Sequence, residues 1–144
     1  MLRVNNREYF MKVMGIEFAG SSLNYVVVEL NDKNELQVLQ SNRLVLGDTR
    51  SRDSLVSFQN AVSTLFNAAS PDLIGIKAKP EAGAMRAGAA ALKMEGIVLA
   101  NSPCEVDFVS GARINKCAVE NLALFAYLQP ALKAAHAALA KRLA

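Results

Sequence analysis

Histidine and cysteine are scarce in this 144-residue chain, and their scarcity excludes several classes of site. His136 is the only histidine and lies in an alanine-rich tail, so Ser-His, Cys-His and His-based metal sites cannot be assembled within one chain. Cys104 and Cys117 show neither a C-x-x-C spacing nor a disulfide-rich pattern, which predicts reduced thiols in the cytoplasm. Neither G-x-x-x-x-G-K-[ST] nor G-x-G-x-x-G occurs, so both standard nucleotide-binding loops are absent.

Long apolar runs and a strong charge excess are also missing. No apolar run approaches the roughly 18 residues that a membrane-spanning helix needs, so no membrane partner is expected. Sixteen Lys and Arg against 13 Asp and Glu give a net charge of +3, which permits a polyanionic partner without indicating a DNA-coating protein. We expect a polar N-terminal extension over residues 1–10 and one globular domain over residues 11–144.

Three strands in succession are predicted after the extension. They cover residues 12–18, 23–30 and 35–46, and short turns at 19–22 and 31–34 join them. Apolar residues recur at three and four between Leu55 and Ala69, which predicts an amphipathic helix that Ser70 and Pro71 end.

The second half of the chain alternates strands with helices. A near-continuously apolar strand at 72–79 indicates a central position covered on both faces. A helix from about Gly83 to residue 100, a short strand at 104–109 and a helical remainder broken at Pro130 follow. The order βββαβαβα predicts an α/β protein with a mixed five-stranded sheet flanked by helices, the succession of the RNase H-like fold, and disfavours the Rossmann order.

Glu17 is the most informative acid, because it interrupts an apolar central strand one residue before its turn. A carboxylate there needs a cation, a metal ion or water, since burying it unpaired costs several kcal/mol. Lys77 stands at the matching place in the fourth strand, and either Lys77 or Lys79 is expected to pair with Glu17. The alternative is that both lysines face solvent at the end of a strand.

The expected helix start near Gly83 adds a second feature to this region. The first N–H groups of a helix are unpaired and favour an anion, so Lys77, Lys79 and the helix start are predicted to hold a phosphate. Glu81 would compete by placing its own negative charge there, or would serve only as a helix cap.

Further cations are candidates for the same anion-binding surface. Arg86 and Lys93 are seven residues apart and are expected to share a helix face, with Glu95 beside them. Arg113 and Lys116 follow the fifth strand and could line the edge of the sheet with the two lysines. Phe108 is the nearest ring, so base stacking is not indicated.

Three stretches resemble a known family: "MKVMGIEFAG", "IKAKPEAGAMRAGAAALKMEG" and "FVSGARI". They are similar to a bacterial family of small proteins with a domain of unknown function, DUF3010, placed in the RNase H-like superfamily, over residues 11–116. The resemblance implies the fold and singles out six residues: Glu17, Lys77, Lys79, Gly83, Lys93 and Glu95.

A looser likeness is to the RuvC-type Holliday-junction resolvases, which share the strand order and the glycine, isoleucine and acid of the first strand. In RNase H-like nucleases that acid holds metal ions with a second acid from the fourth strand and a third from the last helix. This chain has Lys77 in place of the second acid, and its C-terminal region offers only Glu120.

Three functions are therefore open. The first is a cofactor-free module that binds nucleic acid or a phosphorylated ligand through its basic residues. The second is a divergent hydrolase in which Glu17, with Glu95 or Asp107, holds Mg²⁺ or Mn²⁺. The third is a homodimer formed by the C-terminal helices, on the evidence of an apolar stripe between Leu124 and Leu143.

Overall fold

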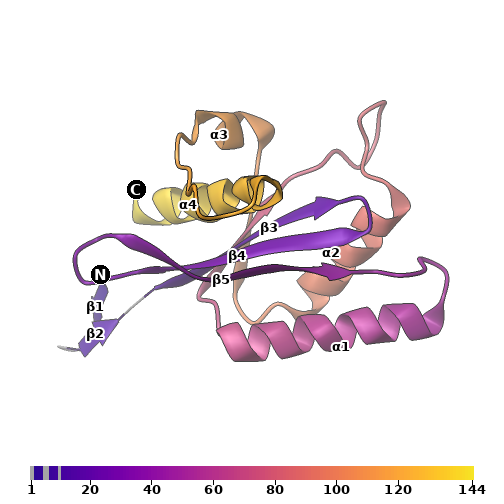
Figure 1. Ribbon diagram of the computed structural model, residues 1–144, viewed down its shortest axis with the longest axis horizontal. Helices are drawn as coiled ribbons and strands as arrows, with labels where there is room; N and C mark the ends of the chain where they lie inside the picture. The colour runs from indigo at the N-terminus through magenta and orange to yellow at the C-terminus, as the bar shows by residue number, and fades with distance from the viewer. Residues whose placement is uncertain (1, 5–6, 10) are drawn as a thin grey trace.

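Five strands form a mixed sheet with helices on both faces (Figure 1). The computed structural model describes residues 2–4, 7–9 and 11–144, the first six of them by their backbone alone. The strands lie in the order β5-β4-β3-β6-β7, with β3 antiparallel to β4 and parallel to β6. Their bounds are Lys12–Ala19 for β3, Ser22–Leu30 for β4, Leu36–Val45 for β5, Leu73–Lys77 for β6 and Glu105–Val109 for β7. The predicted fold class is confirmed.

Local residue chemistry explains the two hairpin turns. Gly20 joins β3 to β4 with a φ of 59°, a left-handed conformation that glycine adopts without a steric cost. The side-chain oxygen of Asn31 accepts hydrogen bonds from the backbone N–H groups of Lys33 and Glu35, both at 2.9 Å, and so holds the turn between β4 and β5.

Helix α1 (Arg52–Ala69) has the boundaries that its sequence signals suggest. The Ser51 hydroxyl accepts a hydrogen bond from the N–H of Ser54 at 3.2 Å, which caps the helix start. At the other end Ser70 adopts a φ of 46°, and Pro71 follows it. The remaining helical elements are α2 (Ala89–Asn101), α3 (Gly111–Lys116), the 3₁₀ turn η1 (Ala126–Leu128) and α4 (Gln129–Leu143).

Two predicted helical segments differ from the structure. The helix expected from Gly83 begins at Ala89, because Pro80 and a Gly83 with φ of 94° cannot continue a helix and Gly88 takes the N-cap position. Residues 78–88 instead form a loop that projects from the body of the molecule (Figure 1). Residues 117–125 are irregular rather than helical, and Pro130 lies in the first turn of α4, where its missing N–H costs nothing.

Alternate residues of the strands supply two separate cores. Met14, Ile16 and Phe18 of β3 face α1 and α2, whereas Met11 and Val13 face α4. The apolar stripe of α4 packs on the second of these faces through Ala131, Leu132, Ala134, Ala135, Ala138 and Leu139. Because this stripe is buried within the chain, it gives no support to a homodimer. The homodimer stays a prediction that no other observation supports.

The first ten residues contain more regular structure than the expected polar extension. Strands β1 (Leu2–Val4) and β2 (Arg7–Tyr9) pair antiparallel as a two-stranded sheet of their own. Residues 1, 5, 6 and 10 of the predicted extension lie outside the described part of the chain. None of the helices in the described part is long and apolar enough to cross a membrane.

Two glycines let α4 approach the centre of the sheet closely. A Cβ at Gly15 would collide with the backbone carbonyl of Ala131, and one at Gly75 would collide with that of Ala134. The helix backbone therefore lies directly on β3 and β6, and no side chain larger than hydrogen fits at these two positions.

We expect Gly15→Ala to destabilise the protein by about 1–3 kcal/mol or more, because the collision is with backbone that cannot rotate away. Gly96→Ala is the matched control: it lies within α2 with no atom within 4 Å of the added Cβ, so it should stabilise the fold by about 0.5–1 kcal/mol. Urea denaturation of both variants measures the difference, and equal stabilities would contradict the close helix contact.

Candidate functional site

An ion pair between Glu17 and Lys77 lies at the carboxyl ends of the two central strands. In the parallel register of β3 and β6, Ile16 is opposite Ile76, so the next residues are neighbours. The Lys77 Nζ donates to Glu17 Oε2 at 3.1 Å, and only 12% of the Glu17 side chain and 30% of the Lys77 side chain are exposed. Each comes two residues after a glycine that faces α4, and therefore lies on the same side of the sheet as α4. The predicted pairing is confirmed for Lys77.

Two more polar residues continue this line across the sheet. Asn24 of β4 is directly opposite Glu17, and Arg43 of β5 is directly opposite Asn24. Residues opposite each other in antiparallel strands share a face, so Lys77, Glu17, Asn24 and Arg43 form one transverse line, here called the polar row. The row crosses four of the five strands of the sheet.

Asn24 is the most buried member of the polar row, with 4% exposure. Its Oδ1 atom has no hydrogen-bond partner among the residues that the structure describes. A buried amide oxygen without a donor costs about 1–3 kcal/mol, so this residue lowers the stability of the fold. Such exceptions to local stability rules concentrate at functional sites.

Two aromatic rings lie at the Arg43 end of the polar row. The Arg43 guanidinium carbon is 5.6 Å from the centroid of the Tyr127 ring, and the Phe125 and Tyr127 rings stack with centroids 6.0 Å apart. Sequence reasoning missed both rings because it placed them in a helix, where residues two apart face different directions. Phe125 has an extended backbone, with φ −58° and ψ 151°, immediately before η1. The F-x-Y spacing in a region without charge was the only available signal.

The other predicted cations do not gather at the ion pair. Strand β6 ends at Lys77, so Lys79 lies in the loop that follows, where it is half-buried. Arg86 lies in the same loop, where its Nη1 donates to the Gly83 carbonyl at 3.3 Å. Lys93 lies on α2 and donates to the Thr49 carbonyl at 2.6 Å. The prediction that Arg86 and Lys93 share a helix face is wrong, because α2 begins after Arg86.

Gly83 is likewise not at a helix start, so the predicted phosphate pocket of Lys77, Lys79 and first-turn N–H groups does not form. Alanine-rich sequence suggested a long helix here, but Pro80, Gly83 and Gly88 interrupt it before Ala89. Lys77 is held by Glu17 instead, and the first free N–H groups of α2 belong to residues after Gly88.

Arg113 has a structural partner that the sequence does not reveal. Its guanidinium donates to both carboxylate oxygens of Asp107, at 3.2 and 2.8 Å, and to the Ala137 carbonyl at 3.1 Å. The hydrogen bonds to Asp107 raise the pKa of Arg113, and the three bonds together fasten α3 to β7 and α4. Arg113 therefore lies against β7, an edge strand of the sheet, where a carboxylate already holds its guanidinium. Lys116 is exposed at the end of α3.

The acidic residues are dispersed. Burial raises the pKa of the Glu95 carboxyl on α2, and the nearby charge of Glu81 raises it further. Asp107 is held by Arg113 and lies 3.8 Å from the Lys141 Nζ. Within the described ranges no group of three or more His, Cys, Asp or Glu side chains is placed to hold a metal ion. A lysine ammonium cannot ligate a cation and repels one, so the residues around Glu17 do not fit the two-metal centre of RNase H-like nucleases.

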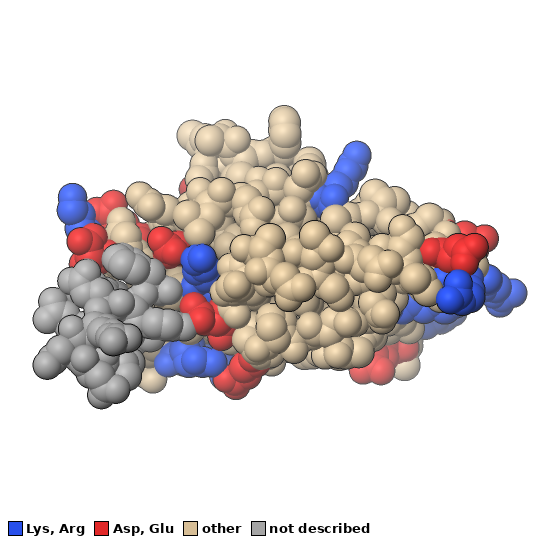
Figure 2. All heavy atoms as spheres, turned by 90° about the horizontal axis from the view of Figure 1, so that it is seen from below, with Lys and Arg blue, Asp and Glu red and all other residues tan. Residues whose placement is uncertain are grey.

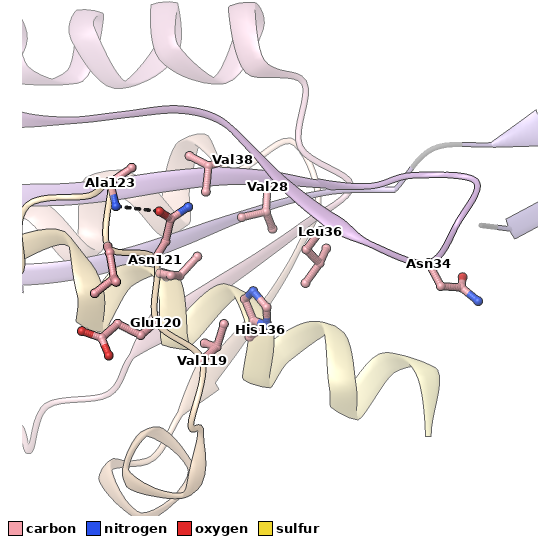
Figure 3. Close-up of a pocket in the computed structure, with 11 residues that line it drawn as sticks. Val28, Asn34, Leu36, Val38, Val119, Glu120, Asn121, Ala123 and His136 are labelled. Carbon is pink, nitrogen blue, oxygen red and sulfur yellow. Dashed lines mark hydrogen bonds between the residues drawn. The ribbon is translucent and has the colours of Figure 1, made fainter.

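A hollow lies away from the polar row, between α4, the hairpin of β4 and β5, and residues 119–123 (Figure 3). Its volume is about 540 Å³, and Val28, Leu36 and Val38 form its apolar wall. His136 points from α4 toward this wall, and burial lowers the pKa of its imidazole. The lining includes the Glu120 carboxylate and no lysine or arginine, so this hollow suits an anion less well than the polar row does.

The strand order, the helices on both faces and the central acid define an RNase H-like protein. The chain belongs to the family described as "Protein of unknown function (DUF3010)", whose model matches residues 11–141. No curated protein matches the chain in sequence.

Solved structures with the same fold include Holliday-junction resolvases. Thermus thermophilus RuvC has a TM-score of 0.74 at 14% identity, with 92% of this chain and 96% of RuvC covered. T. thermophilus RuvC in complex with a Holliday junction substrate gives 0.71 at 15% identity, with the same coverage. The yeast mitochondrial resolvase Ydc2 gives 0.52 at 12% identity, covering 69% of this chain and 50% of Ydc2. At these identities the likeness establishes the fold.

We expect Lys77→Met to destabilise the protein by about 1–3 kcal/mol, because it leaves the largely buried Glu17 carboxylate without its cation. Adding Glu17→Gln should restore part of that loss, so a double-mutant cycle should give a coupling free energy of roughly 0.5–3 kcal/mol. The exposed pair of Arg52 and Asp53 is the control, and Arg52→Met with Asp53→Asn should show no measurable coupling. Equal coupling in the two cycles would contradict a buried ion pair.

Asn24→Leu should stabilise the protein by about 0.5–2 kcal/mol, because leucine keeps the same branched arrangement of side-chain heavy atoms and removes the buried oxygen that lacks a donor. Thermal and urea unfolding measure the change. Asn101→Leu is the comparison, since the Asn101 amide donates to the Ile97 carbonyl at 2.7 Å and its loss should destabilise α2. If Asn24→Leu destabilised the fold by as much, the Asn24 amide would have a structural role.

Proposed function

We propose that this protein binds nucleic acid at the end of the sheet where the polar row lies, and that it does so without the metal-dependent chemistry of nucleases with this fold. The observation that carries the proposal is the 3.1 Å ion pair of Lys77 with Glu17, which puts an ammonium where such nucleases have a second acid. The RNase H-like fold supplies the scaffold, and a structure of RuvC with the same fold contains a Holliday junction substrate.

The charge distribution supports one side of the molecule over the other. Between residues 54 and 69, α1 carries no charged side chain, and Figure 2 shows a broad area of uncharged residues in the middle of this face. Nucleic-acid phosphates would find no cation there. Among the described residues, Arg43, Lys79, Arg86 and Lys116 form no ion pair within 4 Å. Arg43 is a member of the polar row, and Lys79 follows the end of β6 two residues after Lys77.

The alternative is a hydrolase in which Glu17, with Glu95 or Asp107, holds Mg²⁺ or Mn²⁺. Asp107 is engaged by Arg113 at 2.8 Å, and the charge that shifts the pKa of Glu95 comes from Glu81 rather than from Glu17. The donor set that this mechanism needs is therefore not assembled around Glu17, and binding without cleavage is the better-supported function.

The proposal is tested by fluorescence anisotropy with single-stranded, duplex and four-way junction DNA over a range of salt concentrations. A contact with about four phosphates should give a slope of log affinity against log salt of roughly −3 to −4. Incubation of the same substrates with Mg²⁺ or Mn²⁺ should give no cleavage. Absence of binding at low salt would overturn the binding function, and cleavage that Glu17→Gln abolishes would establish the hydrolase instead.

Lys79→Ala with Arg86→Ala should weaken binding of all sequences alike and reduce the magnitude of the salt slope by about 1 for each phosphate that no longer has a cation beside it. Lys33→Ala is the matched control, because Lys33 is an exposed lysine in the turn between β4 and β5, at the opposite end of β4 from Asn24. If the control substitution, which removes one charge instead of two, had half the effect of the double substitution, only net charge would matter.

A further inference from the structure

We infer that Phe125 and Tyr127 form a stacking platform for an unpaired nucleobase; this inference rests on the proposed nucleic-acid binding and specifies which form of nucleic acid is bound. Phe125 is 73% exposed and Tyr127 is 40% exposed. Their planes differ by only 12°, with centroids 6.0 Å apart. Neighbouring apolar rings that are this open to water mark an interaction site.

The surroundings of the rings favour a nucleobase as that group. Arg43 lies 5.6 Å from the centroid of Tyr127, so a cation accompanies the rings. Arg43 is also the last member of the polar row, which places the rings at the end of the sheet assigned to nucleic acid. An aromatic face with an arginine beside it matches a ligand that alternates flat bases with phosphates. A purely apolar protein partner would gain nothing from the charge.

Hydrogen bonds from a side chain of α4 hold the segment that precedes the rings. The Gln129 side chain in the first turn of α4 donates to the Asn121 carbonyl at 2.7 Å and to the Leu124 carbonyl at 3.2 Å. It also accepts from the N–H of Asn121 at 3.3 Å. Three hydrogen bonds from one amide hold residues 121–124 in place immediately before Phe125. A platform that is already ordered loses less conformational entropy when a base stacks on it.

The inference distinguishes unpaired from paired bases. A base within a duplex is stacked between its neighbours and cannot lie on a protein ring, whereas a base in a single strand, a bulge or a junction can turn outward. The rings should therefore contribute to the binding of single strands and unpaired positions and contribute little to the binding of fully paired DNA.

The test uses the full chain and oligonucleotides that carry the fluorescent base 2-aminopurine, either in a single strand or paired in a duplex. Stacking on an aromatic ring quenches this base, so we expect quenching with the single strand. Phe125→Ala should weaken single-strand affinity by about 5- to 150-fold, the range that corresponds to 1–3 kcal/mol per stacked base. Duplex affinity should change less than twofold.

Two further variants of Phe125 separate stacking from folding and from general hydrophobicity, and a variant of Phe108 serves as the control. Phe125→Tyr keeps the ring and should keep both affinity and quenching, whereas Phe125→Leu keeps apolar volume and should lose them. Phe108→Ala removes a ring of 40% exposure on β7, across the sheet from Arg43, and should leave single-strand binding unchanged.

The outcomes distinguish this inference from the proposed function. If the protein binds DNA but Phe125→Ala changes single-strand and duplex affinity equally, or quenching is absent, the platform is refuted and the nucleic-acid function stands. If neither form of DNA binds at low salt, both are overturned. Selective loss of single-strand affinity with Phe125→Leu, and its retention with Phe125→Tyr, would establish the platform.

Discussion

The backbone contact of α4 with Gly15 and Gly75 is the constraint on which the rest of the structure depends. Because two neighbouring strands carry hydrogen atoms where α4 crosses them, the helix lies on the sheet backbone rather than on a layer of side chains. The small residues Ala131, Ala134, Ala135 and Ala138 complete this close approach from the helix side. The next residue on the same face is Glu17 in β3 and Lys77 in β6. The ion pair therefore lies at the boundary between the core that α4 covers and solvent.

That position explains how the ion pair tolerates partial burial. Each charge keeps some contact with water, since 12% of Glu17 and 30% of Lys77 are exposed, so neither bears the full desolvation cost of a buried ion. The Lys77 ammonium supplies the positive charge that lies beside the Glu17 carboxylate.

The sequence predicts the parts of this site that depend on strand order and fails where loops decide the geometry. Glu17 and Lys77 could be paired from sequence because two central parallel strands bring their carboxyl ends together. The start of α2 could not be predicted from the sequence. Its alanine-rich composition favours a helix, whereas the positive φ of Gly83 is a local backbone property. The partner of Arg113 could not be predicted, because nothing local reveals that Asp107, six residues away on another element, binds it.

The position of the two rings was likewise not predictable from the sequence. Phe125 and Tyr127 come together because the chain is extended at Phe125 and turns at η1, a conformation that helix periodicity does not foresee. Asn24 could be placed opposite Glu17 from the meander of strands, but its lack of a donor depends on every element packed around it.

Gln129 couples the conformation of the segment that carries the rings to the conformation of the first turn of α4. Its side chain holds residues 121–124, and its backbone begins the helix whose next turn crosses Gly15. Fraying of the first turn of α4 would therefore loosen the loop at the same moment. A molecule that immobilises the rings would in turn slow hydrogen exchange at amides of α4 that it never touches.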